Sequence, residues 1–297
     1  MSEPMVEVTR GALVECRHRG DVAVMAGRRL AWRLGDPVKV TYFRSAAQPV
    51  QALGVVADGA AGRFGFSDAE IAVMCASHYG EPFHRETVRG ILRKIGLTGK
   101  DLRCGVTPSL DPAVALRTAA AGAPLDETVS DCSGKHAGIL AACVQAGWDT
   151  ADYNAQDPPV QRRIRALVAE VCGMTEESIV IGVDGCSVPV FGLPLSAMAR
   201  AYARLAGPSD LPPPLAAAAR RIFRAMTAHP EMIAGTGGFC TELIRAGGGN
   251  LIGKLGAEGV YCIGVREPNL ALALKVADGG TRAIPPAALR ALAEAGR

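Results

Sequence analysis

The feature that most constrains the fold is the placement of strand-like segments at both ends of the chain, around a long helical middle. Near the N-terminus, short runs of strand-forming residues between turns predict strands at Leu13–Arg19, Asp21–Met25, Leu30–Leu34 and Val38–Thr41. After Gly249 the pattern returns at Leu251–Lys254, Val260–Val265 and Leu270–Val276. We therefore expect an α+β protein with one antiparallel sheet, built from about 6–41 and 251–276, in a single domain that spans 1–297.

The middle of the chain, about 46–230, shows helical periodicity and helix start signals. The capping box Ser67-Asp68-Ala69-Glu70 opens a helix that runs to about Ser77. Further helices are predicted at Arg85–Ile95, Pro112–Ala121, Ser133–Gly147, Pro159–Cys172, Leu195–Ala206, Pro214–Ala228 and Pro285–Ala295, with one short strand at Ile179–Val183. These helices would form a second layer or lobe beside the sheet. The pattern alone fits a generic α+β protein with unrelated ends equally well.

Composition and charge exclude several classes of function. The chain has 297 residues, 49% of them hydrophobic and 21% charged, which excludes a disordered protein. The net charge of +3 is small and the basic residues are scattered, so nucleic-acid binding has no support. The N-terminus contains acidic residues and no apolar core of a signal peptide, and no window approaches the roughly 20 apolar residues that span a bilayer. We expect a soluble, cytoplasmic protein that does not bind membranes.

The nine cysteines form no disulfide framework. Six stand among apolar neighbours and are expected to be buried small hydrophobes, namely Cys16, Cys75, Cys104, Cys143, Cys172 and Cys262. The other three, Cys132, Cys186 and Cys240, stand in turns rich in glycine and serine and need another explanation. Cys240 fits a site thiol and a packing residue equally well. The nearby glycine runs at 235–238 and 247–249 match no phosphate-binding fingerprint, so we expect turns beside a site.

A serine, a second serine and a lysine occur in the order found in penicillin-recognising serine enzymes. Ser45 lies where the N-terminal strands give way to a helix near Gln48, so its hydroxyl is close to free backbone N–H groups that favour an oxyanion. Ser77 ends the capped helix, and Lys254 lies on a returning strand. Gln48 stands where the first motif has lysine, and glutamine cannot act as a general base. Taken alone, Ser45 is more often a helix cap than a nucleophile.

Two turns carry residues that suit a metal. Cys132 and His136 share a helix face, because they are four residues apart, and Asp184 and Cys186 follow the short middle strand. Together they offer the ligands of a tetrahedral zinc site. The alternative is a pair of buried thiols beside a helix cap, because no Cys-x-x-Cys motif is present.

Taken together, these segments resemble the rhizobial-type, or class 3, asparaginases, also called the asparaginase II family. The landmarks cover nearly the whole chain: RHRG at 17–20, FRSAAQP at 43–49, CASHYGEPFH at 75–84, CSGKHAG at 132–138, DGCSVP at 184–189, HPEMIAGTG at 229–237, GAEGVY at 256–261 and LALKVADG at 272–279. The resemblance implies a serine β-lactamase-like fold, a homodimer, and hydrolysis of L-asparagine to L-aspartate and ammonia. It does not extend to the other types of asparaginase.

The resemblance also assigns roles to residues of this sequence. Ser45 takes the position of the nucleophile, and Ser77 with Lys254 forms the second of two Ser-Lys tandems. One zinc ion per chain is implied at Cys132, Lys135 and Cys186, with Asp184 close by. Lys135 replaces His136, which the spacing alone favours, as the metal ligand. Arg44 and Cys240 match positions that line the family's pocket, and Arg44 is expected to pair with the α-carboxylate of the substrate.

Two residues depart from the family pattern. Gln48 replaces the lysine of the first tandem, and Asp131 stands where asparagine is usual. General-base catalysis contributes roughly 10²–10⁴-fold, so loss of that lysine strikes directly at the mechanism. Besides an asparaginase, the sequence therefore allows an inactive or slow homologue that binds an amino acid. It also allows a glutaminase or an acyltransferase on the same fold.

Overall fold

The computed structural model describes residues 1–122 and 125–295, and its larger sheet joins the two ends of the chain. This six-stranded sheet runs in the order β1-β2-β9-β8-β7, and β3 also pairs with β2. Its strands are β1 (Glu3–Arg10), β2 (Leu13–Ala26), β3 (Arg29–Leu34), β7 (Leu251–Gly256), β8 (Val260–Val265) and β9 (Leu270–Val276). All of its pairings are antiparallel.

The join between the chain ends is the ladder of β2 with β9. It runs from Gly20 opposite Val276 to Ala26 opposite Leu270, and it is buried where the core residues Val22 and Val24 lie. This ladder confirms the α+β prediction of one antiparallel sheet made from both termini. The two strands predicted at 13–19 and 21–25 are one continuous strand, because Gly20 continues the ladder without a turn.

One strand that was predicted for the terminal sheet belongs instead to a second, three-stranded sheet. β4 (Val40–Tyr42) pairs with β6 (Pro189–Pro194), which in turn pairs with β5 (Val180–Val183). The expected strand at 38–41 is therefore not part of the terminal sheet. The chain leaves that sheet at a turn that buried Asp21 fixes, because its carboxylate accepts hydrogen bonds from the Asp36 amide and from Lys39.

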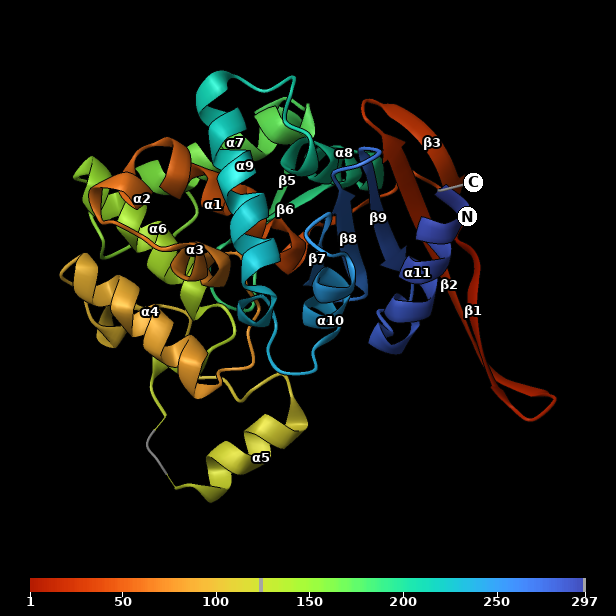
Figure 1. Cartoon of the computed structure of the whole chain (residues 1–297), viewed down its shortest axis with the longest axis horizontal. Coiled ribbons are helices and arrows are strands. Elements are labelled where there is room, and N and C mark those ends of the chain that lie inside the picture. Colours follow the sequence, from red (N-terminus) through yellow and green to blue (C-terminus); the bar gives the residue numbers. More distant parts are fainter. Residues whose placement is uncertain (123–124, 296–297) are drawn as a thin grey trace.

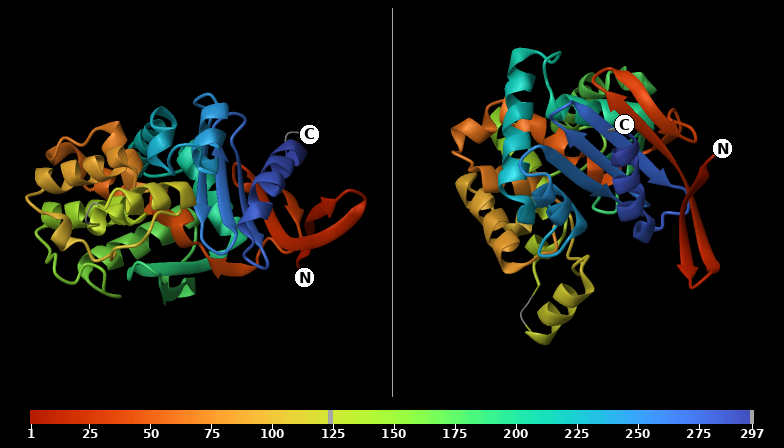
Figure 2. Two further views of the ribbon diagram at one scale, coloured as in Figure 1. Left: turned by 90° about the horizontal axis from the view of Figure 1, so that it is seen from below. Right: turned by 45° about the vertical axis from the view of Figure 1, so that its right-hand side comes forward.

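Two helices lie on opposite faces of the larger sheet. α8 (Leu195–Ala206) packs on β2, β8 and β9 on the side of the helical region, and α11 (Ile284–Ala295) contacts β9 and its neighbours. Figure 1 shows the sheet beside the helical region, and Figure 2 shows α11 on the outer side of the sheet. Both termini lie at the sheet end of the molecule (Figure 1).

The helical region is the second lobe that the sequence predicts. Its helices are α1 (Gln48–Ala57), α2 (Ala60–Arg63), α3 (Asp68–Met74), α4 (Pro82–Lys94), α5 (Pro112–Ala120), α6 (Ser133–Ala146), α7 (Pro159–Cys172), α9 (Pro213–Ala228) and α10 (Phe239–Ala246). Short 3-10 turns include η1 (Arg44–Ala47), η3 (Glu127–Val129) and η5 (Pro230–Met232). No helix among residues 1–122 and 125–295 is long and apolar enough to cross a membrane.

The close contact of α6 with α3 depends on glycine. A Cβ atom at Gly134 would lie 2.1 Å from the carbonyl oxygen of Val73, and one at Gly138 would lie 3.1 Å from the Met74 side chain. Only residues without a side chain let the two helices come this close. Because α3 leads to Ser77 and α6 begins beside Cys132, this contact fixes the distance between the two sets of candidate residues.

Candidate active site

Ser77, Cys240 and Lys254 line one pocket, between the end of α3, α10 and the start of the C-terminal part of the sheet. The pocket has a volume of about 300 Å³, and Tyr79 and Tyr261 also line it. Ser77 lies more than a hundred positions before Cys240 and Lys254 in the sequence, so the fold, and not local sequence, brings it to the other two.

An extended segment after α3 presents Ser77 to this pocket. Hydrogen bonds hold the segment to both of its neighbours: the Ser77 amide donates to the Ile233 carbonyl, and the His78 amide donates to the Asp131 carbonyl. The Tyr79 ring packs against Gly235, where a Cβ atom would lie 2.5 Å from the ring. The glycine-rich stretch at 235–238 is therefore a turn beside the site, as predicted.

Lys254 is a fully buried amine that points at Ser77. Its Nζ donates hydrogen bonds of 2.8 Å to Ser77 Oγ and of 2.8 Å to the Leu255 carbonyl oxygen. Burial lowers the pKa of Lys254, although Cys240 and Asp131 act in the opposite direction. A lowered pKa makes the neutral amine, which is the form that accepts a proton, more accessible near neutral pH.

Gln48 extends this hydrogen-bonded chain. Its side chain is completely buried, and Oε1 accepts a 3.2 Å hydrogen bond from Ser77 Oγ. Its Nε2 points to Cys132 Sγ at 3.8 Å. Gln48 therefore connects the Lys254–Ser77 pair to the thiols, and the residue that departs from the family pattern lies inside the candidate site.

Ser45 lies in η1, immediately before α1. The N-cap of α1 is Ala47, so Ser45 does not serve as its cap. The Ser45 side chain is half-buried, and its hydroxyl has no hydrogen-bond partner within residues 1–122 and 125–295. Because η1 packs against β7, the strand that carries Lys254, Ser45 belongs to the same region of the fold. Its assignment as nucleophile stays a prediction.

Arg44 is held by Asp184 rather than standing free for a substrate. Its Nε and Nη2 lie 3.1 and 2.9 Å from Asp184 Oδ1, and its backbone has a φ of 50°. A positive φ is uncommon for a residue with a side chain. The pair joins the serine segment to the Cys186 turn, which brings both candidate regions into contact.

The thiols of Cys132 and Cys186 meet beside the Lys135 amine, and all three side chains are buried. Lys135 Nζ lies 2.9 Å from Cys186 Sγ. A hydrogen bond from Cys132, followed by the charges of Lys135 and His136, lowers the pKa of the Cys186 thiol far below its usual value. A lowered pKa favours the thiolate, the form of cysteine that binds metals.

These three residues form a donor set of two sulfur atoms and one amine, which suits zinc once the amine loses its proton. The two thiols act to raise the pKa of Lys135, so this amine carries a proton until a metal replaces it. Nowhere in the described part of the chain do three His, Cys, Asp or Glu side chains come together as a metal site. The amine donor beside the two thiols is Lys135, whose Nζ is 2.9 Å from Cys186 Sγ.

His136, the ligand that spacing alone favours, lies beside the Cys186 thiol, and Tyr153 holds its other ring nitrogen. Its Nδ1 lies 2.7 Å from the Tyr153 hydroxyl, and its Nε2 is buried with no hydrogen-bond partner in the described residues. Asp131, the second departure from the family pattern, is largely buried, and burial raises the pKa of its carboxyl group. Its Oδ2 lies 3.6 Å from Cys132 Sγ.

Sequence reasoning did not identify Tyr79 and Tyr261 as wall residues of the pocket. Tyr79 had a usable signal, since it follows Ser77 by two residues on an extended segment and so reaches the same region. Tyr261 had no such signal, because in the sequence it cannot be told from an ordinary core tyrosine of a strand. All nine cysteines are free, and those named above as core residues are buried except Cys16, which is partly exposed.

A comparison with protein families gives one match over almost the entire chain. The model of the family described as L-asparaginase II matches residues 6–297. The chain belongs to the L-asparaginase II family. Family membership confirms the resemblance drawn from the sequence motifs, and it supports an amide hydrolase that acts on asparagine, a small-molecule substrate.

Two solved structures are similar to this chain over most of its length. A β-lactamase from Mycobacterium bovis is similar over 93% of this chain and 94% of its own, with 16% identity and a TM-score of 0.46. A candidate β-lactamase from Bacteroides dorei is similar over 91% of this chain and 92% of its own, with 15% identity and a TM-score of 0.49. No curated protein matches the chain in sequence.

Proposed function

We propose that this chain hydrolyses the side-chain amide of L-asparagine to L-aspartate and ammonia in the pocket of Ser77 and Lys254. The observation that carries the proposal is the fully buried Lys254 amine, 2.8 Å from Ser77 Oγ, in a member of the L-asparaginase II family. Placing a lysine amine in such a site costs desolvation energy. A role in proton transfer, for which the neutral amine is needed, explains why a lysine is buried here.

We assign the nucleophile to Ser45. Its hydroxyl has no hydrogen-bond partner in the described part of the chain, is partly accessible, and precedes α1, where backbone N–H groups stabilise negative charge. The Ser77 hydroxyl is already engaged at both ends, accepting from Lys254 and donating to Gln48. Ser77 is therefore suited to relay a proton, and Ser45 to form a bond with substrate.

The proposed reaction has two stages. Ser45 Oγ attacks the amide carbon, its proton passes to Ser77, and the Ser77 proton passes to Lys254 Nζ. The tetrahedral intermediate then expels ammonia, which takes a proton back through Ser77, and leaves aspartate as an ester on Ser45. Water attacks the ester carbon by the same proton route and frees the serine. General-base assistance of this kind contributes about 10²–10⁴-fold.

Substrate orientation is assigned to Arg44 and Cys240. Asp184 engages Nε and Nη2 of Arg44, so Nη1 remains to contact the α-carboxylate of asparagine. Cys240 forms part of the pocket wall, where its Sγ accepts a 3.3 Å hydrogen bond from the Leu255 amide next to Lys254. Its role is to fix that wall rather than to react.

We further propose one zinc ion per chain at Cys132, Lys135 and Cys186, with Asp184 close by. When bound, the metal would tie the start of α6 to the Cys186 turn and so support the pocket. Gln48 Nε2, 3.8 Å from Cys132 Sγ, would carry this support to Ser77. Metal analysis of protein purified without chelator should find about one zinc per chain, and Cys186→Ser should remove it. Absence of zinc from the unmodified protein contradicts this assignment.

The direct test of the substrate is ammonia release from a panel of amides, measured with and without chelator. We expect L-asparagine to be the best substrate and L-glutamine to be turned over at least about tenfold more slowly. One methylene changes transition-state binding by about 1–3 kcal/mol, which gives a factor of this size. Faster release from glutamine would assign the chain to glutaminase chemistry instead.

A second candidate function is a binding protein that holds asparagine without turnover. Gln48 favours this alternative, because its amide lies beside Ser77, where the family has a lysine, and cannot accept a proton. Saturable binding of asparagine with no ammonia over hours would establish this alternative.

The resemblance also implies a homodimer, and we propose that state for the protein in solution. Light scattering during size-exclusion chromatography should give twice the chain mass of 30.8 kDa. A mass of one chain at micromolar concentration contradicts it.

A further inference from the structure

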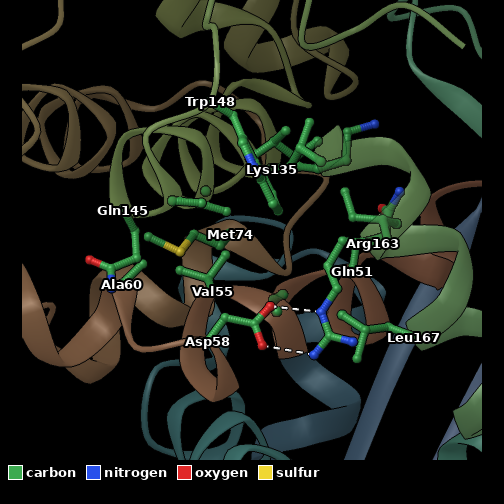
Figure 3. A pocket seen from close by; sticks show the side chains of 18 residues that line it. Gln51, Val55, Asp58, Ala60, Met74, Lys135, Gln145, Trp148, Arg163 and Leu167 are labelled. Atoms are coloured by element: carbon green, nitrogen blue, oxygen red, sulfur yellow. Dashed lines mark hydrogen bonds and ion pairs between the residues drawn. The ribbon is translucent and has the colours of Figure 1, made fainter. Parts of the chain in front are cut away.

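A second cavity lies in the helical region, on the other side of Lys135 from the thiols. It has a volume of about 110 Å³ and lies between α1, α6 and α7, with Met74, Trp148 and Leu167 among its apolar wall residues (Figure 3). An engineered cavity of about 150 Å³ holds benzene. This space is smaller, but it opens to solvent at the edge where Asp58 and Arg163 are partly exposed, so a small ring compound would fill it and extend to that edge. None of the proposed catalytic residues lines it.

Gln51 gives the cavity a polar feature that the fold does not use. Its side chain lines the cavity and is only 6% exposed, yet its amide has no hydrogen-bond partner within the described residues. Gln48, one turn earlier on α1, has both ends of its amide engaged. The Gln51 amide is therefore available to a molecule inside the cavity.

The charges around the cavity are already matched. Arg163 makes two hydrogen bonds of 2.9 and 2.7 Å to Asp58 at the exposed edge, and Figure 3 shows this pair beside the apolar residues. Lys135 is paired with Cys186 on the other side of the wall. An ionised ligand would find no free counter-charge here and would lose its hydration. An uncharged ligand would not.

We propose that this cavity binds a small, uncharged molecule with an apolar body and one carboxamide group. A primary amide offers one donor and one acceptor, which matches the acceptor and donor of Gln51 in a reciprocal pair. The apolar body packs between Met74, Leu167 and the Trp148 ring. The site is separate from the pocket of Ser77 and Lys254, and it does not depend on the proposed asparaginase reaction.

Trp148 provides a direct readout. The chain has two tryptophans, and the other, Trp32, lies on β3 at the opposite end of the molecule (Figure 1). In a Trp32→Phe background, the fluorescence of Trp148 is followed during titration with benzamide, benzoate and toluene. We expect saturable binding of benzamide, and binding of benzoate at least about tenfold weaker because its charge is unpaired.

Two substitutions test the assigned contacts. Gln51→Met keeps the volume and removes the amide, so benzamide binding should weaken about fivefold while toluene binding changes less than about twofold. Ala142→Leu fills the cavity and should abolish binding of both, whereas Ala119→Leu on exposed α5 should change neither. Circular dichroism verifies the fold of each variant.

Three results would overturn the proposal: no saturable change with benzamide, benzoate binding as tightly as benzamide, or benzamide affinity that is insensitive to Gln51→Met. If Ala142→Leu fails to fold, the Gln51→Met comparison of benzamide with toluene still decides the question. The benzamide titration also separates this proposal from the proposed function, since it needs no asparagine turnover.

Discussion

At the scale of single residues, Gln48 determines how protons reach the proposed nucleophile. It accepts from Ser77 and donates toward Cys132, so it orients Ser77 without being able to take its proton. In the proposed reaction, Lys254 is then the base of the Ser-Lys relay. Because the Gln48 amide cannot accept a proton, we expect it to lower the rate of asparagine turnover.

Replacing Gln48 with lysine tests this interpretation. In Gln48→Lys an amine would stand near Ser77 and Lys254, and two neighbouring ammonium groups repel. The repulsion lowers the pKa of one of them, which makes a second base available. We expect asparagine turnover to rise at least about tenfold, below the ~10²–10⁴-fold range of general-base catalysis, and the acid limb of the pH–rate profile to move to lower pH.

Gln51→Lys is the matched control for that change. It introduces the same charge one turn along α1, at a position that faces the second cavity, so it should give no increase. Unchanged or lower turnover in Gln48→Lys would show that the Gln48 amide itself is needed, with Lys254 as the only base.

The ordered set of Ser45, Ser77 and Lys254 could be predicted from sequence because the motifs stand in one order. The structure brings Ser77 and Lys254 together, while the role of Ser45 stays a prediction. The two contacts of Gln48 could not be predicted, because they join residues 29 and 84 positions apart and depend on packing. The pairing of Arg44 with Asp184, 140 positions apart, has no local signal either.

At the scale of elements, helices with clear caps were predicted best. α7 and α8 agree with the sequence at both ends, because proline opens or precedes each and glycine follows. α10 was missed because it lies between two glycine-rich stretches and is only eight residues long. β1 was missed because its side chains are mostly exposed or half-exposed, so it has no apolar face to reveal it.

The contact of α6 with α3 makes a sharp prediction. In Gly134→Ala the new Cβ atom would lie 2.1 Å from the Val73 carbonyl oxygen, so the helices must separate. We expect the free energy of unfolding in urea to fall by about 3 kcal/mol, the upper end of overpacking costs. The separation should also lengthen the path from Ser77 to the thiols and reduce asparagine turnover.

Gly62→Ala on α2 is the control, because a Cβ atom there meets nothing within 4 Å. The better helix propensity of alanine should raise the free energy of unfolding by up to about 1 kcal/mol. Equal effects of the two substitutions would contradict the role given to the close approach.

At the scale of the whole molecule, the two ends of the chain build one sheet and the middle builds a helical lobe. The sequence predicted this plan, because strand patterns at the ends and helix patterns in the middle are properties of local sequence. It did not predict the small sheet of β4, β5 and β6, in which a strand near the N-terminus, β4, pairs with β6, about 150 residues later.

Burial of two stacked histidines links this architecture to acid stability. His78 and His84 are fully buried, with ring centroids 4.8 Å apart. Burial lowers the pKa of His78, and it lowers the pKa of His84 from 6.5 to about 4. The unfolded chain therefore binds more protons than the folded chain between these values, and stability must fall as the pH falls from about 6.5 to 4.

For His84 alone, this difference between the pKa values of the unfolded and folded states lowers the free energy of unfolding by about 3 kcal/mol, at about 1.4 kcal/mol per pKa unit. Urea unfolding at several pH values measures the loss, and His84→Gln should make the dependence on pH shallower. His229→Gln, at a partly exposed position, is the control. Stability that stays constant from pH 6.5 to 4 would contradict the neutral, buried state of the pair.

The most direct measurement for the whole account is ammonia release from L-asparagine by the purified protein and by Ser45→Ala. A small hydroxyl that caps no helix contributes little to folding, so the variant should keep the unfolding curve of the unmodified protein. We predict measurable ammonia from the unmodified protein and none above background from Ser45→Ala. Turnover by Ser45→Ala at a tenth of the unmodified rate or more would contradict the account and transfer the nucleophile to another residue, first of all Ser77.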